Sequence, residues 1–419
     1  MPVLGQVAER FARTRPLRGI RVGACLHITA ETANLVSALV AGGAQVALCA
    51  ANPLSTQDEV AASLSALAGA RVHGARGEST DELLAHVRRV IDWLPDVVID
   101  DGADLLAGVH ELHAEHAADM LGGMEETAAG LLRVRALQSE GVLACPVLAV
   151  NESRAERAFN DRYGTGQSTI DGILRATNLL LAGRTVVVLG YGYTGRGVAL
   201  RARGAGASVI VCEVDHLRAL EARMAGYQVM PALEASAGGD VFVTVTGGRE
   251  VLRGEHFERM KDGAVLANAG HFDVEIALQE LRSLSSSVAQ VLPLVEQHTL
   301  ADGRRLNLLA EGRVVNLAAG EGHPAAVMDI SFAIQALCVE HLVLGAGRLA
   351  PAVLEVPAEI DAEVARLKLD SLGVQIDELT ESQLLYRSVW EEGRRGAAQP
   401  APAEEPAGAA GAASAGDPQ

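Results

Sequence analysis

The stretch of this chain with the clearest chemical meaning is an apolar segment followed by closely spaced glycines. Residues 185–189 are mostly β-branched, and Gly190, Gly192 and Gly195 follow directly. The first glycine permits a tight turn, the second lets backbone amides approach a pyrophosphate, and the third lets the next helix pack close to the strand. The N-terminus of that helix then faces the anion. The pattern predicts a dinucleotide-binding turn.

An acidic residue ends the next expected strand, at residues 208–213. Glu213 follows Gly190 by 23 residues. A carboxylate at this position can accept hydrogen bonds from both ribose hydroxyls of NAD and would repel the additional phosphate of NADP. A glycine-rich turn in an α/β protein that binds no nucleotide is the alternative. The strand, the spacing and the acid together favour NAD as the cofactor.

The composition bounds the class of protein. A chain of 419 residues with 49% hydrophobic content can bury large cores and should form two or three domains. The net charge of −18 and the aromatic content of 3% disfavour nucleic acid as a partner, because a phosphate backbone is repelled and few rings can stack on bases. The five cysteines lack paired spacing, which predicts reduced core residues rather than disulfides or a zinc site.

No segment is expected to enter a membrane. We find no apolar run near the roughly 18 residues that a span requires. Residues 1–14 carry Glu9, Arg10 and Arg13 without the apolar core of a signal peptide. The sequence therefore predicts a soluble, cytoplasmic protein without a membrane partner.

Apolar runs alternate with helical patterns along the chain, which is typical of an α/β fold with doubly wound parallel sheets. In a first domain, strands are expected at residues 20–28, 44–49, 70–74, 95–100 and 146–150. In a second domain, strands at 240–246 and 263–268 are expected to extend the sheet that begins at 185–189. We therefore expect two domains of the same class.

The segment after residue 151 is polar and charged, and we interpret residues 152–166 as a hinge between the two domains. Helical patterns return at 324–344, 360–367 and 379–389. Residues 396–419 consist almost entirely of Ala, Pro, Glu and Gly, so they cannot bury enough apolar area to fold and should form a disordered tail.

Three histidines at helical spacing, His110, His113 and His116, raise the question of a metal site. The third lies well around a helix from the first, and no acidic or cysteine cluster accompanies them. A solvated helix face is the interpretation that we favour, with no metal.

The ordered motifs of this chain resemble the S-adenosylhomocysteine hydrolase family from about residue 17 to residue 386. They include Leu-His-Ile-Thr-Ala-Glu-Thr at 26–32, Asn-Pro-Leu-Ser-Thr-Gln-Asp at 52–58, Asp-Asp-Gly-Ala-Asp at 100–104, Glu-Glu-Thr at 125–127, Ser-Thr-Ile-Asp-Gly at 168–172, Asn-Ala-Gly-His-Phe-Asp at 268–273 and the stretch from Asn316 to His323-Pro324. Chance similarity does not produce such an ordered set.

The resemblance implies a substrate domain assembled from both ends of the chain, with a Rossmann-type NAD domain inserted between them. The boundaries that we expect are 1–151 and 323–372 for the substrate domain, 152–166 for the hinge, 167–322 for the NAD domain, 373–395 for a C-terminal helical segment and 396–419 for the tail. It also implies a homotetramer whose substrate, an adenine nucleoside, lies in the cleft between the domains.

The family's chemistry solves a specific problem, because the C4′ hydrogen of a ribose is not acidic. Oxidation of the 3′-hydroxyl by NAD places that hydrogen beside a carbonyl, so that a carboxylate can remove it and the 5′ substituent can leave. The hydrolase then adds water across the 4′,5′ alkene and returns the hydride. NAD carries the redox step, while the protein supplies positioning and proton transfer.

Residue roles follow from the matching motifs. Asp101 is expected as the base at C4′, His27 and His271 as the groups that handle protons near C5′, and Glu126 as the residue that holds the ribose hydroxyls. The expected adenine contacts are Thr29, Glu31, His323 and Met328, with Glu31 placed to accept from the exocyclic amine. A helix cap or a core hydrogen bond would explain Thr29 and His323 equally well. The expected cofactor contacts are Gly190, Gly192, Tyr193, Thr194, Gly195, Glu213, Arg218, Thr127, Asn268 and Asn316.

The chain departs from the family pattern at the ribose. Where the family carries a lysine and an aspartate around the 3′-hydroxyl, this sequence has Glu156 and Asn160, followed by Asp161. Exchanging an ammonium for a carboxylate reverses the field at the alcohol that is oxidised. Other altered positions are Ala128 and Ala129, Thr165, Glu321 and the C-terminus, which lacks the family's lysine and tyrosine.

Three functions are compatible with this pattern. The first is an NAD-dependent dehydratase that converts an adenine nucleoside into its 4′,5′-unsaturated form, with Glu156 as the base for the alcohol and Asn160 in a wall that accepts an unusual sugar. Such chemistry fits nucleoside secondary metabolism, as in antibiotic biosynthesis, and the high Ala, Gly and Arg content fits a high-GC bacterial genome. The second is a divergent S-adenosylhomocysteine hydrolase. The third is a non-catalytic NAD-binding regulatory relative.

Overall fold

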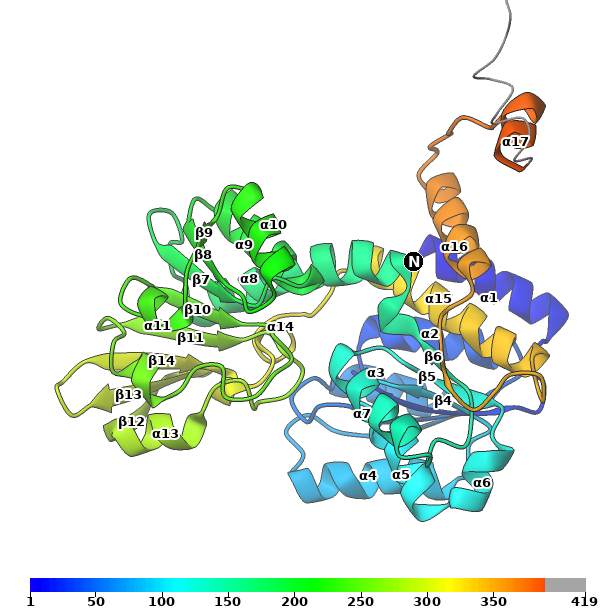
Figure 1. Cartoon of the computed structure of the whole chain (residues 1–419). Coiled ribbons are helices and arrows are strands. Elements are labelled where there is room, and N and C mark those ends of the chain that lie inside the picture. Colours follow the sequence, from blue (N-terminus) through cyan, green and yellow to red (C-terminus); the bar gives the residue numbers. More distant parts are fainter. Residues whose placement is uncertain (389–419) are drawn as a thin grey trace, which may run out of the picture. The chain divides into compact units, whose positions relative to one another are not determined.

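The computed structural model describes residues 1–388 and contains two β-sheets (Figure 1). Residues Met1–Leu372 form one compact unit that includes both sheets. The described residues 373–388 belong to a second unit, in which α17 (Glu381–Ser388) is helical. This helix falls within the expected C-terminal helical segment. Residues 389–395 of that segment and the expected tail lie outside the described residues.

The first sheet has seven parallel strands in the order β15-β6-β5-β4-β1-β2-β3. Most of its strands are buried apolar runs, as parallel strands covered on both faces must be. The strands are β1 (Arg21–Leu26), β2 (Gln45–Ala50), β3 (Ala70–His73), β4 (Val97–Asp100), β5 (Gly122–Glu125), β6 (Val147–Ala149) and β15 (Val353–Leu354).

Helices cover both faces of this sheet, and the alternation of side chains along each strand supplies two cores. In β2, Val46 and Leu48 enter one core, whereas Ala47 and Cys49 enter the other. The first core receives side chains from α1 (Pro2–Thr14), α2 (Ala30–Ala41), α3 (Asp58–Ser65), α15 (Ala325–Leu344) and α16 (Ala358–Ser371). The second receives them from α4 (Thr80–Asp92), α5 (Asp104–Leu112), α6 (Ala114–Asp119) and α7 (Ala128–Ser139).

The two ends of the compact unit meet at a single buried carboxylate. Asp329 of α15 is fully buried, and its Oδ1 accepts from the backbone N–H groups of Val3 and Leu4 in the first turn of α1, each at 2.9 Å. Its Oδ2 accepts from Nζ of Lys368 in α16 at 2.8 Å. The carboxylate therefore satisfies unpaired N-terminal amides of α1 and ties α16 to the same point.

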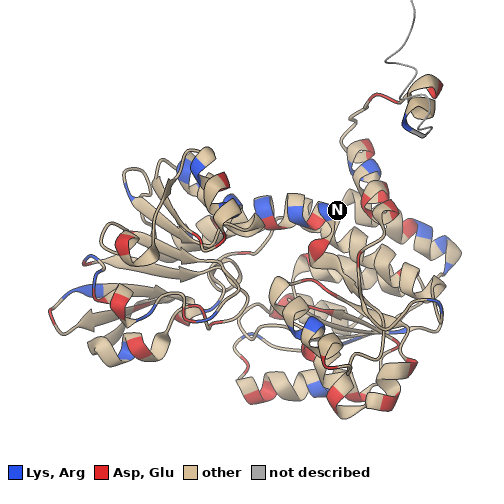
Figure 2. Cartoon of the chain, in the orientation of Figure 1, with Lys and Arg blue, Asp and Glu red and all other residues tan. Residues whose placement is uncertain are grey.

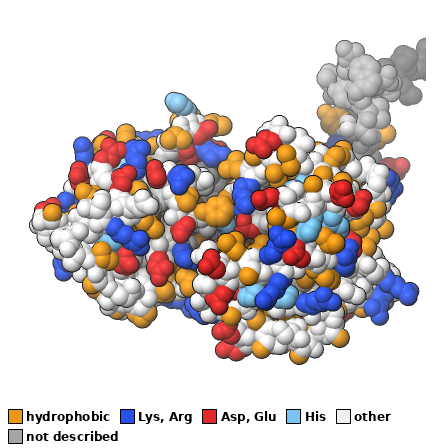
Figure 3. Space-filling model, turned by 90° about the horizontal axis from the view of Figure 1, so that it is seen from below, with side chains coloured by type: hydrophobic (Ala, Val, Ile, Leu, Met, Phe, Trp, Pro, Cys, Tyr) orange, Lys and Arg blue, Asp and Glu red, His pale blue; other side chains and the backbone are white. Residues whose placement is uncertain are grey.

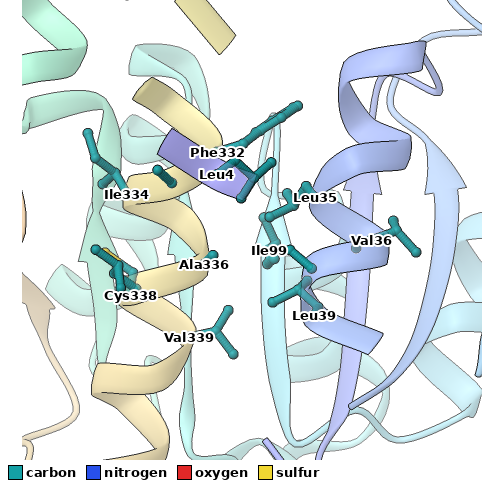
Figure 4. Close-up of a cluster of buried hydrophobic side chains, with 14 of the residues drawn as sticks. Leu4, Leu35, Val36, Leu39, Ile99, Phe332, Ile334, Ala336, Cys338 and Val339 are labelled. Carbon is teal, nitrogen blue, oxygen red and sulfur yellow. The ribbon is translucent and has the colours of Figure 1, made fainter. Parts of the chain in front are cut away.

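Helix α15 is the central helix of the first core. Figure 4 shows Phe332, Ala336 and Val339 of α15 facing Leu35 and Leu39 of α2. By length and composition α15 could cross a membrane, contrary to the expectation that no apolar run is long enough. However, 67% of its apolar window is buried inside the protein, which is how the core helix of a folded domain behaves.

The second sheet has eight strands in the order β12-β13-β14-β11-β10-β7-β8-β9. Six of them, from β14 to β9, are parallel, and β13 pairs antiparallel with both β14 and β12. The strands are β7 (Thr185–Leu189), β8 (Ser208–Cys212), β9 (Gln228–Val229), β10 (Val241–Thr244), β11 (Ala264–Asn268), β12 (Ser285–Leu292), β13 (Val295–Leu300) and β14 (Arg305–Leu309). The α/β class with two parallel sheets is confirmed, whereas the antiparallel extension was not predicted.

Helices again flank the second sheet (Figure 1). They are α8 (Gly166–Thr177), α9 (Tyr193–Gly204), α10 (His216–Met224), α11 (Ala232–Ala235), α12 (Gly254–Phe257), α13 (Leu278–Leu284) and α14 (Val315–Ala318), with a short 3₁₀ turn η3 (Ala310–Gly312). Figure 2 shows that charged residues lie mainly on helices and loops and leave the strands largely uncharged. On the face in Figure 3, acidic and basic side chains are interspersed.

The expected hinge at 152–166 is helical rather than irregular. A 3₁₀ turn, η1 (Val150–Glu152), precedes a π-helix, η2 (Glu156–Thr165), which continues directly into α8. Where η2 continues into α8, the chain lies close to α9: a Cβ at Gly166, the first residue of α8, would lie 2.5 Å from the carbonyl carbon of Gly197 in α9. π-Helical turns are rare and concentrate at functional sites.

Candidate active site

Both sheets share the doubly wound strand order 3-2-1-4-5-6 in their parallel parts, so that each has a switch point between its first and fourth strands. Ligands bind in the crevice outside the carboxyl ends of the strands at such points. In the first sheet, β1 and β4 flank this crevice, and His27 and Asp101 directly follow these two strands. Nε2 of His27 lies 3.1 Å from Oδ2 of Asp101.

A residue of the second sheet completes this cluster. His271 follows β11, and its Nδ1 lies 3.3 Å from Oδ1 of Asp101. A Cβ at Gly102 would stand 2.7 Å from Nε2 of His271, so that only glycine leaves room for the imidazole. The structure therefore brings together the expected base and both expected proton-handling histidines.

Burial and mutual attraction set the charges of this cluster. Burial raises the pKa of Asp101, but the attraction of His27 and His271 outweighs it and leaves that pKa below its usual value. Burial lowers the pKa of His27, yet the contact with Asp101 brings the net pKa of His27 above its usual value. For His271, burial dominates and lowers the pKa. The surroundings therefore favour the charged carboxylate of Asp101, the protonated form of His27 and the neutral form of His271.

The expected adenine contacts also line the cavity described below. Nε2 of His323 lies 3.0 Å from Oγ1 of Thr165, and burial lowers the pKa of His323 to about 4, so the ring is neutral. Thr29 is the N-cap of α2 and accepts from the N–H of Thr32 at 3.5 Å. Helix capping alone would therefore explain Thr29. Glu31 and Met328 line the same cavity.

A wall rich in carboxyl groups lies beside the cluster. Glu126, Glu156, Asn160 and Asp161 all line the cavity, and Asn160 donates to Oγ of Ser331 at 2.7 Å. Burial, together with the charges of neighbouring carboxyls, raises the pKa of Glu156 well above its usual value. Burial and the nearby Asp101 charge raise the pKa of Glu126 to about 7. Burial also raises the pKa of Asp161 to about 7. These acids can therefore be neutral donors or proton acceptors near pH 7.

The glycine turn has the form expected of a pyrophosphate site. A Cβ at Gly190 would meet the carbonyl oxygen of Val245 at 2.7 Å, and one at Gly195 would meet that of Gly190 at 2.1 Å. A Cβ at Gly192 would find only Nη1 of Arg218, at 3.9 Å, so this glycine faces open space. The turn thus needs its glycines for close packing and leaves backbone amides free to approach an anion.

Glu213 stands at the end of β8, as expected for the ribose acid. Its Oε2 accepts from the N–H of Tyr191 at 2.7 Å, and its Oε1 accepts from the N–H of Val214 at 2.7 Å. These bonds hold the carboxylate at the rim of the cavity beside the glycine turn. The residues present therefore fit NAD.

Two expected cofactor residues do not line the cavity. Asn268 is fully buried: its Nδ2 donates to the carbonyls of Phe272 and Gly312, and its Oδ1 accepts from the N–H of Gly270. These hydrogen bonds hold the loop that carries His271, and a direct contact of Asn268 with the cofactor stays a prediction. Gly195 packs against the strand. The expected contacts that do line the cavity are Gly190, Gly192, Tyr193, Thr194, Glu213, Arg218, Thr127 and Asn316.

One cavity of about 1410 Å³ within the compact unit connects the cofactor contacts that line it with the acid–histidine cluster and the expected adenine contacts. Ligand pockets for small molecules usually measure about 300–1,000 Å³, so this cavity has room for a dinucleotide and a nucleoside together. It reaches from Glu213 past the glycine turn to Asp101 and Glu31. The geometry therefore allows the nicotinamide end of a bound dinucleotide to meet a nucleoside at the acid–histidine cluster.

The histidines that raised the question of a metal are not one solvated face. His110 is buried, its Nδ1 lies 2.7 Å from the carbonyl of Leu106, and its Nε2 accepts from the N–H of Ala144. The helix breaks at His113, so α5 and α6 are separate elements. Within residues 1–388, no group of three or more His, Cys, Asp and Glu side chains is arranged to hold a metal ion.

Sequence reasoning missed several residues that shape the site. Ser331 and Gln335 are buried polar residues four positions apart on the apolar helix α15, and this spacing on one helix face was a detectable signal. Gln335 lies near the carboxyl of Glu126, although neither of its amide atoms makes a hydrogen bond. Ser55 contacts His27, and it was noted only as part of a motif.

The fold and the site define a class: an α/β enzyme with one sheet that binds NAD and a second that presents a buried acid–histidine cluster. Family models described as "S-adenosyl-L-homocysteine hydrolase" and "S-adenosyl-L-homocysteine hydrolase, NAD binding domain" match residues 1–117 and 161–322. The chain belongs to the S-adenosylhomocysteine hydrolase family.

Relatives match along nearly the whole chain. The chain is 56% identical to the adenosylhomocysteinase of Aquifex aeolicus over 94% of each chain. It is 53% identical to that of Gloeobacter violaceus, over 94% of this chain and 92% of the relative. It is also 52% identical to the S-inosyl-L-homocysteine hydrolase of Methanopyrus kandleri, over 94% of this chain and 93% of the relative.

Proposed function

We propose that this protein removes the C4′ proton of an adenine nucleoside that has been oxidised at C3′, and that it then expels the substituent on C5′. The observation that carries this proposal is Asp101, a buried carboxylate between two imidazoles at the switch point of the first sheet. A carboxylate held in its charged form by His27 and His271 is a suitable base for a carbon acid beside a carbonyl.

NAD would supply reversible oxidation at C3′ when bound, and the glycine turn, Glu213 and Arg218, which line the cavity, would hold it. The residues of the chain itself transfer the protons and bind the substrate. Asp101 accepts the C4′ proton, and the imidazolium of His27 donates a proton to the departing 5′ substituent. Glu126, whose pKa of about 7 allows it to be neutral, holds ribose hydroxyls. The carboxylate of Glu31 accepts from the exocyclic amine, which supports adenine over hypoxanthine as the base.

The fate of the unsaturated nucleoside distinguishes two candidate functions. The first is hydrolysis of S-adenosylhomocysteine to adenosine and homocysteine, and the names of the relatives support it. The second is dehydration of an adenine nucleoside to a 4′,5′-unsaturated product, which the carboxyl-rich wall favours. Glu156 and Asn160 provide hydrogen-bonding groups where a different sugar could bind, and Glu156 could serve as the base for the alcohol.

One experiment separates these candidates. The holoenzyme with NAD is incubated with S-adenosylhomocysteine and, separately, with adenine nucleosides that carry a 5′-hydroxyl. Homocysteine released to a thiol reagent identifies the hydrolase, and a product lighter by one water in mass spectrometry identifies the dehydratase. Asp101→Asn is the control that should abolish either product. If neither product forms and no NADH accumulates, the proposal is wrong and a regulatory NAD-binding protein remains.

The assembly and location are also part of the proposal. We propose a cytoplasmic homotetramer that acts on a small nucleoside without nucleic-acid or membrane partners, in line with the family resemblance and the net charge of −18. Light scattering of the purified holoenzyme tests the tetramer, and a monomer would contradict it.

A further inference from the structure

Ser55 is a buried residue of the loop between β2 and α3, and its hydroxyl contacts His27 of the acid–histidine cluster. Its Oγ lies 2.7 Å from Nδ1 of His27. The same Oγ lies 2.9 Å from the backbone carbonyl of Asn52. A carbonyl oxygen can only accept, so the hydroxyl proton of Ser55 is donated to Asn52.

The direction of the hydrogen bond from Ser55 to Asn52 determines which ring nitrogen of His27 carries the proton in the neutral imidazole. A serine hydroxyl has one proton, and once that proton is donated to Asn52 the oxygen can only accept from the imidazole. Nδ1 of His27 must therefore carry a proton, and Nε2 is left as the nitrogen that faces Oδ2 of Asp101 at 3.1 Å. The tautomer of a histidine is set in this way by the hydrogen bond that its other nitrogen makes.

We propose that Ser55 is a positioning residue that keeps the proton on Nδ1 of His27, so that only Nε2 exchanges protons with Asp101 and the substrate. The part of this inference that concerns the substrate rests on the proposed function. Nε2 gives its proton to the departing 5′ substituent, Asp101 takes the proton from C4′, and that proton then passes from Asp101 to Nε2. The net result is one proton moved from C4′ to the leaving group.

The groups that face His27 come from several elements. Asp101 follows β4, Glu126 follows β5, His271 follows β11 and His323 precedes α15. None of them lies within hydrogen-bond distance of Nδ1, whose partner is the hydroxyl of Ser55. Loss of the Ser55 hydroxyl would leave a buried N–H unpaired and allow the proton to move to Nε2 as the single proton of the neutral ring.

The direct test is nitrogen NMR of the holoprotein with ¹⁵N-labelled histidine, recorded without nucleoside from about pH 5 to pH 9. The His27 signals are identified by their loss in His27→Gln. We expect Nδ1 to stay protonated throughout and Nε2 to titrate. In Ser55→Ala we expect a mixture of tautomers at high pH, and in Ser55→Thr the wild-type pattern. An Nδ1 without its proton in the wild-type protein at high pH would overturn the proposal.

Turnover gives a second readout. Ser55→Ala should lower kcat by about 10- to 100-fold with little change in KM and should shift the pH profile, because general acid–base catalysis depends on the protonation state of His27. Ser55→Thr should restore the profile. Ser65→Ala, which also removes a hydroxyl bonded to a backbone carbonyl but lies in α3, should change neither. An unchanged pH profile in a folded Ser55→Ala protein would contradict the proposal. The NMR result does not depend on turnover, so the proposed function can fail separately.

Discussion

Oδ1 of Asp101 lies 3.3 Å from Nδ1 of His271, and this contact joins the carboxyl edges of two separate sheets. Asp101 follows β4 of the first sheet, whereas His271 follows β11 of the second. The cluster is therefore complete only when both sheets contribute. This arrangement places proton transfer at the same point where a dinucleotide held by the second sheet would meet a nucleoside held by the first.

Glu156→Lys should redirect the chemistry at the sugar. A lysine would place a positive charge beside Glu126 and Asp161, so both carboxyls would be held in their charged form. We expect homocysteine release from S-adenosylhomocysteine to rise and any water loss from 5′-hydroxy nucleosides to fall by at least about 10-fold. Both reactions are measured on the holoenzyme. Glu140→Lys, at the exposed end of α7, is the control for added charge, and equal changes in both reactions would contradict the assigned role of the wall.

The stability of the protein should fall between pH 6.5 and pH 8. Burial raises the pKa of Asp100 to about 8 and, with the Asp101 charge, that of Glu126 to about 7. Because these folded pKa values exceed the unfolded ones, the folded state binds more protons, and its stability is lost as pH rises through the folded pKa.

Urea unfolding of the wild type and of Asp100→Asn measures this effect. The asparagine oxygen can still accept from the N–H of Leu106, as Oδ2 of Asp100 does at 2.8 Å. We expect the slope of unfolding free energy against pH to become shallower in Asp100→Asn by up to about 1.4 kcal/mol per pH unit. Asp119→Asn, an exposed change, should leave the slope as it is. If the unfolding free energy changes with pH equally in all three proteins, Asp100 is charged in the folded state and the prediction is wrong.

Lys368→Met should destabilise the protein far more than Arg366→Met in the same helix. Lys368 is the partner of the fully buried Asp329, which would be left as an unpaired buried charge at a cost of about 3 kcal/mol. Arg366 pairs with Glu363 and Asp370 on the exposed side of α16, where such pairs contribute at most about 1 kcal/mol. Denaturant unfolding compares the two variants. Equal losses would contradict the structural role of Asp329 at the junction of the chain ends.

The parts of the fold that follow from periodicity could be predicted from sequence. Three features appear where the local residue spacing places them. They are the strand before Gly190, the acid Glu213 after the next strand and the long helix at 324–344. The family, the α/β class and NAD as the family's cofactor are confirmed.

Other features depend on tertiary packing and were not predictable in this way. Strand β5 begins with two glycines, which weaken strand propensity, yet Gly122 has a φ of +145° and a Cβ there would lie 2.6 Å from the carbonyl oxygen of Pro146, so the fold requires glycine at this position. The polar segment at 152–166 contains a π-helix, Glu156–Thr165, in which Glu156 and Asn160 are buried and Asn160 donates to Ser331 of α15. The buried hydrogen bonds that Asn268 makes to Phe272 and Gly312 likewise depend on tertiary packing and are invisible in sequence.

The most direct test of the central claim is hydrogen exchange at C4′. The NAD-loaded protein is mixed in D₂O with S-adenosylhomocysteine or with an adenine nucleoside, and the C4′ proton is followed by NMR. We predict that this proton is lost to solvent at least as fast as any product forms, and that Asp101→Asn slows the loss by about 100- to 10,000-fold. Products that form while C4′ keeps its original hydrogen would contradict the account.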